Sequence, residues 1–114
     1  MFQVHTLVPE FWCSNFEDSL HFYTEVVGFS VAQRRGNDLH AYLELGNAQI
    51  MIACWKRDGT WEPAPLEKPY GRGVNFQILT DDIQSIYLSA LSADIKPFVE
   101  LHTRWYWRTD RMEE

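Results

Sequence analysis

The chain has 114 residues, of which 46% are hydrophobic and 23% charged, so it is long enough for one soluble domain with a buried core. Its formal net charge of -6 and its lack of Lys and Arg clusters disfavour nucleic acid as a partner, because phosphate binding needs such clusters. No stretch reaches the ~18 apolar residues of a membrane-spanning helix, and the N-terminus lacks a signal-peptide pattern. We therefore expect no membrane partner and a cytoplasmic location.

The first half of the chain predicts the order β-α-β-β-β. Residues 2–12 are rich in aromatic and β-favouring residues and predict a strand, with Pro9 near an edge or bulge. Ser14 or Asn15 can cap the helix that follows, and Gly28 ends it. The apolar stripe of this helix is Phe16, Leu20, Tyr23, Val26 and Val27. Further strands are predicted at residues 29–35, 39–45 and 48–55. Alternation in the middle one of these indicates one buried face.

A proline- and glycine-rich stretch separates this half from the next. Residues 56–73 hold three prolines and three glycines, which exclude a long helix or a central strand, so we expect a connecting loop. A loop of this length is usually functional or a linker, and this one carries Trp61 and Tyr70.

The second half repeats the pattern of the first more briefly. Asp81 and Asp82 predict the start of a second helix. Strands are predicted on both sides of it, at residues 74–79 and 95–101, with residues 105–107 extending the sheet. The order of elements indicates an internal repeat. We therefore expect a single domain over residues 1–114, consisting of module one (1–55), the connecting loop (56–73) and an incomplete module two (74–114).

No catalytic constellation stands out in the sequence. A metal site needs three or four converging His, Cys, Asp or Glu ligands, and the histidines show no paired spacing such as H-x-x-x-H. These histidines are His5, His21, His40 and His102. There is no nucleophile elbow, and Cys13 and Cys54 lie among apolar residues, so we expect buried, reduced thiols. The sequence predicts no catalytic residue, no metal ligand and no cofactor.

The aromatic share of 15%, with five Trp, is high and suits either a core or a flat ligand. Such rings could build a stacking cleft, with Glu10 or Glu44 meeting a cationic group. The alternative is that at least half of the rings pack in the core or in a dimer interface. The candidate ligand-binding rings are Trp12, Trp55, Trp61, Tyr70, Trp105 and Trp107.

Four strings spread over nearly the whole chain point to one family. They are LVPE at residues 7–10 with SL-x-FY at 19–23 and GF at 28–29, PLEKPYGRG at 65–73 running into NFQ at 75–77, DDI at 81–83, and WY-x-R-x-D at 105–110. Together with the order of elements, they resemble the vicinal oxygen chelate superfamily, in its glyoxalase and bleomycin-resistance-like branch. The resemblance implies an α+β fold in which paired βαβββ modules form a curved mixed sheet, commonly assembled as a homodimer.

The resemblance also bears on metal binding. In metal-dependent members, a His on the first strand of each module binds a divalent ion together with carboxylates on later strands. The matching positions in this chain are Val8 and Asn75, which are not such ligands. His5 is out of register with Val8 by three residues, which in a strand also places it on the other face. The resemblance therefore disfavours a metal enzyme.

Metal-free members of this branch bind drugs such as bleomycin in clefts at the dimer interface, and so confer antibiotic resistance without chemistry. The leading expectation is thus a protein that sequesters a flat, cationic drug or metabolite. By resemblance, the best cleft candidates are Trp12, Trp55, Trp61 and Trp105. Two alternatives stay open: a metal-dependent glyoxalase- or dioxygenase-type enzyme, and a shortened, inactive member that serves as an assembly module.

The chain departs from the family pattern near its end. The family normally continues with further strands beyond the position of Asp110, whereas this chain ends at Glu114. The second half-sheet would then have an open edge, which attracts another strand. We expect a partner subunit to cover that edge in a homodimer, by exchange of a strand or of the terminal segment.

Overall fold

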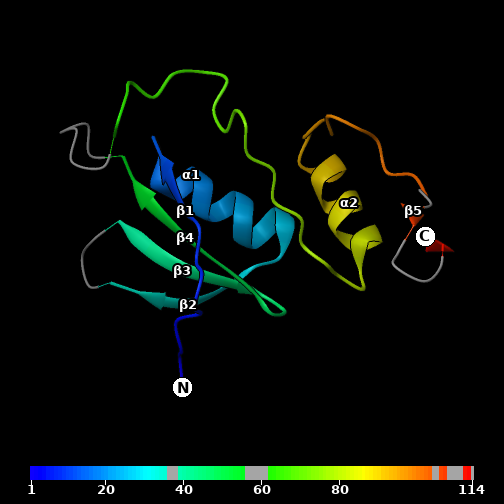
Figure 1. The fold of residues 1–114 in the computed structure, drawn as a ribbon, viewed down its shortest axis with the longest axis horizontal. Coiled ribbons are helices and arrows are strands. Elements are labelled where there is room, and N and C mark those ends of the chain that lie inside the picture. Colours follow the sequence, from blue (N-terminus) through cyan, green and yellow to red (C-terminus); the bar gives the residue numbers. More distant parts are fainter. Residues whose placement is uncertain (36–38, 56–61, 104–105, 108–111, 114) are drawn as a thin grey trace.

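The first half of the chain forms a four-stranded mixed sheet with a helix packed on one face (Figure 1). The computed structural model describes residues 1–35, 39–55, 62–103, 106–107 and 112–113. The strands are β1 (Glu10–Cys13), β2 (Ser30–Arg34), β3 (His40–Leu45) and β4 (Ala48–Cys54), and they lie in the order β1-β4-β3-β2. β1 runs parallel to β4, while β2, β3 and β4 pair antiparallel. The expected α+β fold with a curved mixed sheet is confirmed.

The first helix begins and ends where the sequence predicts. The Asn15 side chain accepts a hydrogen bond from the Asp18 N–H at 3.0 Å and so caps α1 (Phe16–His21). The helix continues as a π-helical turn, η1 (Phe22–Val27), a widening that the sequence does not predict. Gly28 then ends it with φ of 105°, a left-handed conformation that a residue with a side chain rarely adopts.

The core lies between this helix and the sheet. Leu43 and Ile52 are fully buried in the middle of β3 and β4, and Phe16 of α1 packs on them. Partly buried side chains from β1, from the helix and from the ends of β3 and β4 complete this core; they are Phe11, Cys13, Leu20, Tyr23, Val27, Leu45 and Cys54. The predicted alternation in β3 is confirmed, because Ala41 and Leu43 face the core.

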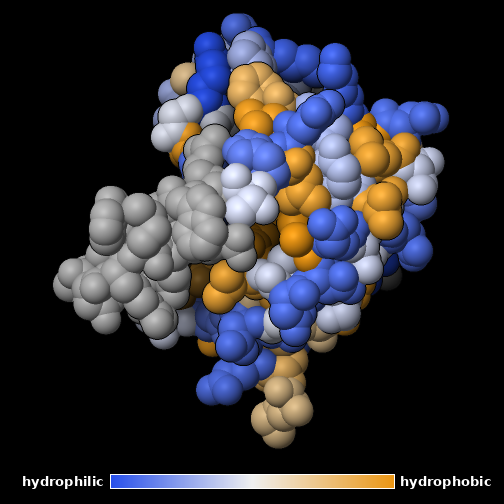
Figure 2. Space-filling view, turned by 90° about the vertical axis from the view of Figure 1, so that its right-hand side faces the viewer, coloured by the Kyte–Doolittle hydropathy of each residue, from blue (hydrophilic) through white to orange (hydrophobic). Residues whose placement is uncertain are grey.

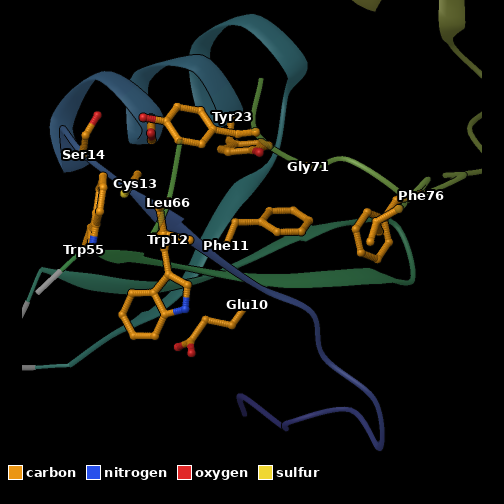
Figure 3. A pocket seen from close by; sticks show the side chains of 13 residues that line it. Glu10, Phe11, Trp12, Cys13, Ser14, Tyr23, Trp55, Leu66, Gly71 and Phe76 are labelled. Atoms are coloured by element: carbon orange, nitrogen blue, oxygen red, sulfur yellow. The ribbon is translucent and has the colours of Figure 1, made fainter. Parts of the chain in front are cut away.

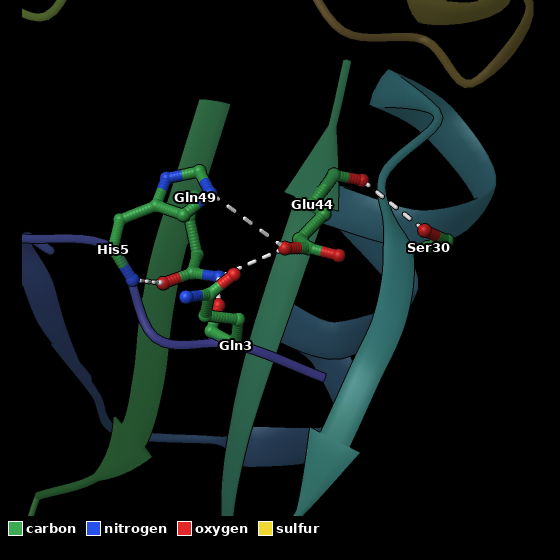
Figure 4. A network of polar contacts seen from close by, with 5 residues as sticks. All are labelled: Gln3, His5, Ser30, Glu44 and Gln49. Atoms are coloured by element: carbon green, nitrogen blue, oxygen red, sulfur yellow. Dashed lines mark hydrogen bonds and ion pairs between the residues drawn. The ribbon is translucent and has the colours of Figure 1, made fainter. Parts of the chain in front are cut away.

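The predicted first strand is shorter than expected, because the residues before it use side-chain hydrogen bonds instead of a strand ladder. Gln49, only 4% exposed, accepts a hydrogen bond from the His5 N–H at 2.8 Å and donates to the Gln3 carbonyl at 3.0 Å (Figure 4). The same amide donates to the Glu44 carboxylate at 2.8 Å. The N-terminal segment is thereby tied to the face of the sheet that lies opposite α1.

In the second half, the predicted helix is confirmed, and the prediction of strands on both sides of it is wrong. α2 (Ile83–Ser92) is capped by Asp82, whose carboxylate accepts from the Ser85 N–H at 3.4 Å. Residues 74–79 and 95–101 form no strand, since neither segment pairs with another part of the described chain. β5 (Tyr106–Trp107) pairs with β6 (Met112–Glu113) in a separate two-stranded sheet and so does not extend the main one. Trp105 lies outside the described residues.

Many apolar side chains of the second half face solvent. α2 has no buried residue, and its contact with the first half runs through η1, where the Ser89 hydroxyl donates to the Glu25 carbonyl at 3.4 Å. Figure 2, which views the molecule from the side where α2 lies, shows apolar patches on this surface. The exposed apolar residues here include Val74, Phe76, Ile78, Leu79, Ile83, Leu88, Leu91, Phe98, Val99 and Leu101. Within the described residues, no helix is long and apolar enough to cross a membrane.

Candidate functional site: a cavity at the free edge of β1

A cavity of about 640 Å³ lies beside β1 (Figure 3). One wall is residues 10–14, another is the start of the first helix with Tyr23, and a third is the connecting segment between Leu66 and Phe76. Trp55, just after β4, closes one end. The cavity is therefore built from four parts of the chain that are distant in sequence.

Its position follows from the place of β1 at the edge of the sheet. The carbonyls of Pro9 and Cys13 accept hydrogen bonds from Met51 and Trp55 of the β4 side, at 2.8 and 2.7 Å. Because parallel strands bond through alternate residues, the backbone N–H and C=O groups of Glu10 and Trp12 point the other way, toward the open edge. Consecutive residues of a strand also send their side chains to opposite faces. A cavity lined by every residue from 10 to 14 must therefore wrap around this edge.

Aromatic contacts hold the connecting segment against β1. The Phe11 ring stacks near Tyr23, with ring centres 6.3 Å apart, and meets Phe76 edge-on at 5.1 Å. Phe76 lies at the end of the connecting segment that forms the third wall, so this contact holds that wall against β1. Burial raises the pKa of the Tyr23 phenol, and the nearby Cys13 raises it further. The Tyr23 hydroxyl is therefore a neutral hydrogen-bonding group at neutral pH.

A negative charge lies at the rim. The Glu10 side chain is 34% exposed, and its carboxylate lies 3.7 Å from Nε2 of His40. His40 is buried on the face of the sheet opposite α1, where its Nε2 is 3.4 Å from the Met51 sulfur. Cys13, Ser14 and Ser19 add small polar groups to the wall. The arrangement can stack a flat molecule and attract a cation, while the carboxylate stays open to solvent.

The structure brings four of the seven predicted ligand-binding residues to this cavity, namely Glu10, Trp12, Trp55 and Tyr70. Glu44, the other carboxylate considered for a cation, instead lies in the polar network of Gln49 and His5 (Figure 4). Trp61 and Trp105 lie outside the described residues. Trp107 belongs to β5, and its side chain is not described.

Sequence reasoning missed three aromatic side chains of the cavity. Tyr23 was predicted as part of the apolar helix stripe, and it does pack against the core while also lining the cavity. Phe11 and Phe76 lie in β-favouring segments, and Phe76 also lies in the NFQ string of the family resemblance, but neither signal points to a cavity. Only the spatial meeting of those two segments makes them part of one site.

Comparison with known proteins places the chain in a family. The model of the glyoxalase/bleomycin resistance protein/dioxygenase superfamily matches residues 3–112, nearly the whole chain. The chain belongs to this superfamily.

Two solved structures are similar to it. One is a glyoxalase/bleomycin resistance protein/dioxygenase superfamily member from Vibrio splendidus 12B01, with 28% identity over 90% of this chain and 78% of that chain and a TM-score of 0.42. The other is an integron cassette protein from the mobile metagenome of the Halifax Harbour sewage outfall, with 16% identity over 78% of this chain and 72% of that chain and a TM-score of 0.46. No curated protein sequence matches the chain.

The described residues do not fit the divalent ion that metal-dependent members of the superfamily bind. The Val8 side chain offers no donor atom, and Asn75 lies exposed on the connecting segment. Glu10 pairs with His40 at 3.7 Å and Glu44 with His5 at 4.0 Å, so each place offers two donors. Across the described part of the chain, no three His, Cys, Asp or Glu side chains gather as a metal site requires.

Proposed function

We propose that the chain is a metal-independent small-molecule binding protein, which holds a flat, cationic ligand in the cavity beside β1 without turning it over. The observation that carries the proposal is the combination of aromatic walls and a rim carboxylate, that of Glu10, in the cavity. Bleomycin and other flat drugs or metabolites that carry a positive charge are the ligands of matching chemistry.

The size and the lining of the cavity support this function. Its volume of about 640 Å³ lies within the ~300–1,000 Å³ typical of small-molecule sites. Aromatic rings on three sides, Trp12, Trp55 and Tyr23, offer faces on which a planar ring system can stack. A cation over such a ring gains roughly 0.5–2 kcal/mol, more where water is excluded.

We further propose that the functional unit is a homodimer in which a second copy closes the cleft. Two features support it: the open edge of β1, with the backbone groups of Glu10 and Trp12 facing outward, and the exposed apolar side chains of residues 74–101. In a two-fold pair each copy can offer its exposed residues 74–79, whose sequence favours a strand, to the other. Sedimentation at several protein concentrations tests this, and a monomer at all concentrations would refute it.

Titration of the intrinsic Trp fluorescence with bleomycin and with proflavine, a flat cationic dye, tests the binding function. We expect the fluorescence to change saturably with ligand concentration, and we expect the Kd to rise when Trp12 is replaced by Leu. The matched control is Phe98→Leu, because Phe98 is fully exposed and does not line the cavity. Unchanged fluorescence at high concentrations of both ligands would refute the proposal and favour an assembly module instead. A stoichiometric divalent ion in freshly purified protein would favour the metal-dependent enzyme.

A further inference from the structure

The chain has two cysteines, Cys13 and Cys54, which are 41 positions apart in the sequence and lie on neighbouring strands. Cys13 ends β1 and Cys54 ends β4, and the two residues are direct partners in the parallel register. Both side chains pack against the same core cluster, which places them on the same face of the sheet. Both are free, half-buried thiols.

This placement suits a covalent bond. Neighbouring strands lie about 4.7–4.9 Å apart, inside the range of about 4.4–6.8 Å over which Cα atoms are joined by disulfides. In the reduced state each sulfur is turned to a carbonyl: Cys13 Sγ lies 3.1 Å from the Ala53 oxygen and Cys54 Sγ lies 3.8 Å from the Trp55 oxygen. A rotation about each Cα–Cβ bond brings the sulfurs toward one another.

We propose that Cys13 and Cys54 form a reversible disulfide, a redox modification site at the wall of the cavity. Cys13 lines the cavity, which gives a small oxidant a route to this residue, and Cys54 lies next to it as the second thiol. The oxidant is of the hydroperoxide class. The site goes beyond ligand binding and does not depend on it.

The chemistry balances in two steps. The Cys13 thiolate attacks the terminal oxygen of the hydroperoxide, so that an S–O bond forms and the O–O bond breaks. The hydroxyl stays on Cys13 as a sulfenic acid, and the alkoxide leaves and takes up the proton lost by the Cys13 thiol to become an alcohol. The Cys54 sulfur then attacks that sulfenic sulfur, the S–S bond forms, and the hydroxyl leaves with the Cys54 proton as water. Two thiols have lost two electrons, and the hydroperoxide has been reduced to an alcohol and water. Exchange with small thiols reverses the bond.

The environment of Cys13 determines how fast its thiol is oxidised to a sulfenic acid. Burial raises the pKa of the Cys13 thiol, Cys54 raises it further, and a hydrogen bond with the Ser19 side chain acts against them. Because the thiolate is the nucleophile, oxidation is slow at neutral pH and accelerates as the pH rises toward the pKa of Cys13. At the same pH the pair therefore reacts more slowly with a hydroperoxide than a solvent-exposed thiol pair would.

The test exposes the reduced, full-length protein to tert-butyl hydroperoxide, followed by alkylation and intact mass analysis. We expect a monomer that has lost two hydrogen atoms, with both thiols lost at one rate that does not change with protein concentration. Dithiothreitol should restore both thiols. In Cys54→Ser, the reaction should stop at a Cys13 sulfenic acid that dimedone traps.

Three results would overturn the proposal. They are retention of both thiols under oxidant, cross-linking between chains instead of within one chain, and a bond that forms as fast in denaturant as in the folded protein. The last comparison separates native proximity from the chance meeting of two thiols in an unfolded chain. Because the decisive measurements use the unmutated protein, the test does not depend on the folding of the serine variant.

Discussion

Replacing Glu10 by Gln should weaken the binding of a cationic ligand and leave a neutral ligand of the same shape unaffected. Glu10 supplies the carboxylate at the rim of the cavity, while the rings of Trp12, Trp55 and Tyr23 supply the stacking faces. Gln keeps the size and the hydrogen-bonding oxygen of Glu and removes the charge. The substitution therefore isolates the electrostatic part of recognition.

The structure sets the size of the effect. Two opposite unit charges about 4 Å apart attract by about 1 kcal/mol in water and by about 4 kcal/mol at an effective dielectric constant of ~20. The Glu10 side chain is 34% exposed, so water screens it and the lower value applies. A loss of about 1 kcal/mol corresponds to a roughly fivefold rise in Kd.

Fluorescence titrations with two flat ligands separate the electrostatic contribution from the stacking contribution. Proflavine is cationic, whereas acridine is neutral at slightly alkaline pH. The matched control is Glu17→Gln, since Glu17 is exposed in the first turn of α1 and does not line the cavity. Both substitutions change the net charge equally, so a loss confined to Glu10→Gln reports a local contact. Equal losses in the two variants, or an equal loss for acridine, would refute the assigned role of Glu10.

Three further predictions concern the fold. Leu43→Ala should lower the free energy of unfolding by about 2–5 kcal/mol, because Leu43 is fully buried and its loss leaves a cavity; a loss below ~1 kcal/mol in urea unfolding would contradict the described core. Stability should fall at alkaline pH, because burial raises the pKa of Cys13 and Tyr23 in the fold, whereas the unfolded chain ionises at the ordinary values of 9.0 and 10.0. This contribution is fully present below those values and is lost as the pH rises through the folded pKa values, so Tyr23→Phe should flatten the alkaline decline of the urea midpoint. Gln49→Ala should release the N-terminal segment and speed amide hydrogen exchange at His5, and unchanged exchange there would show that Gln49 does not hold the segment.

The first half of the fold could be predicted because its signals are local. Asn15 before an apolar stripe and Gly28 after it mark the two ends of a helix in any context. The alternation around Ala41 and Leu43 likewise reports a strand with one buried face. These signals depend on residues a few positions apart and need no knowledge of neighbours.

The second half and the cavity could not be predicted in the same way, because they depend on neighbours. Residues 74–79 favour a strand, but a strand also needs a partner, and within the described residues this segment has none. The sequence predicts a group of rings with Glu10 or Glu44 beside them, because an excess of aromatic residues and the carboxylates are visible in composition, and the structure brings Glu10 and three of those rings to one cavity. That Phe76 meets Phe11, and that β1 lies at an edge with space beside it, follow only from the path of the connecting segment.

The most direct test of ligand binding beside β1 is an NMR titration that follows the indole N–H signals of the five Trp residues as proflavine is added. Binding in the cavity predicts that the signals of Trp12 and Trp55, which line it from two sides, shift together and saturate with one Kd. Signals of Trp12 and Trp55 that stay in place at saturating dye, while other residues shift, would contradict the proposed site.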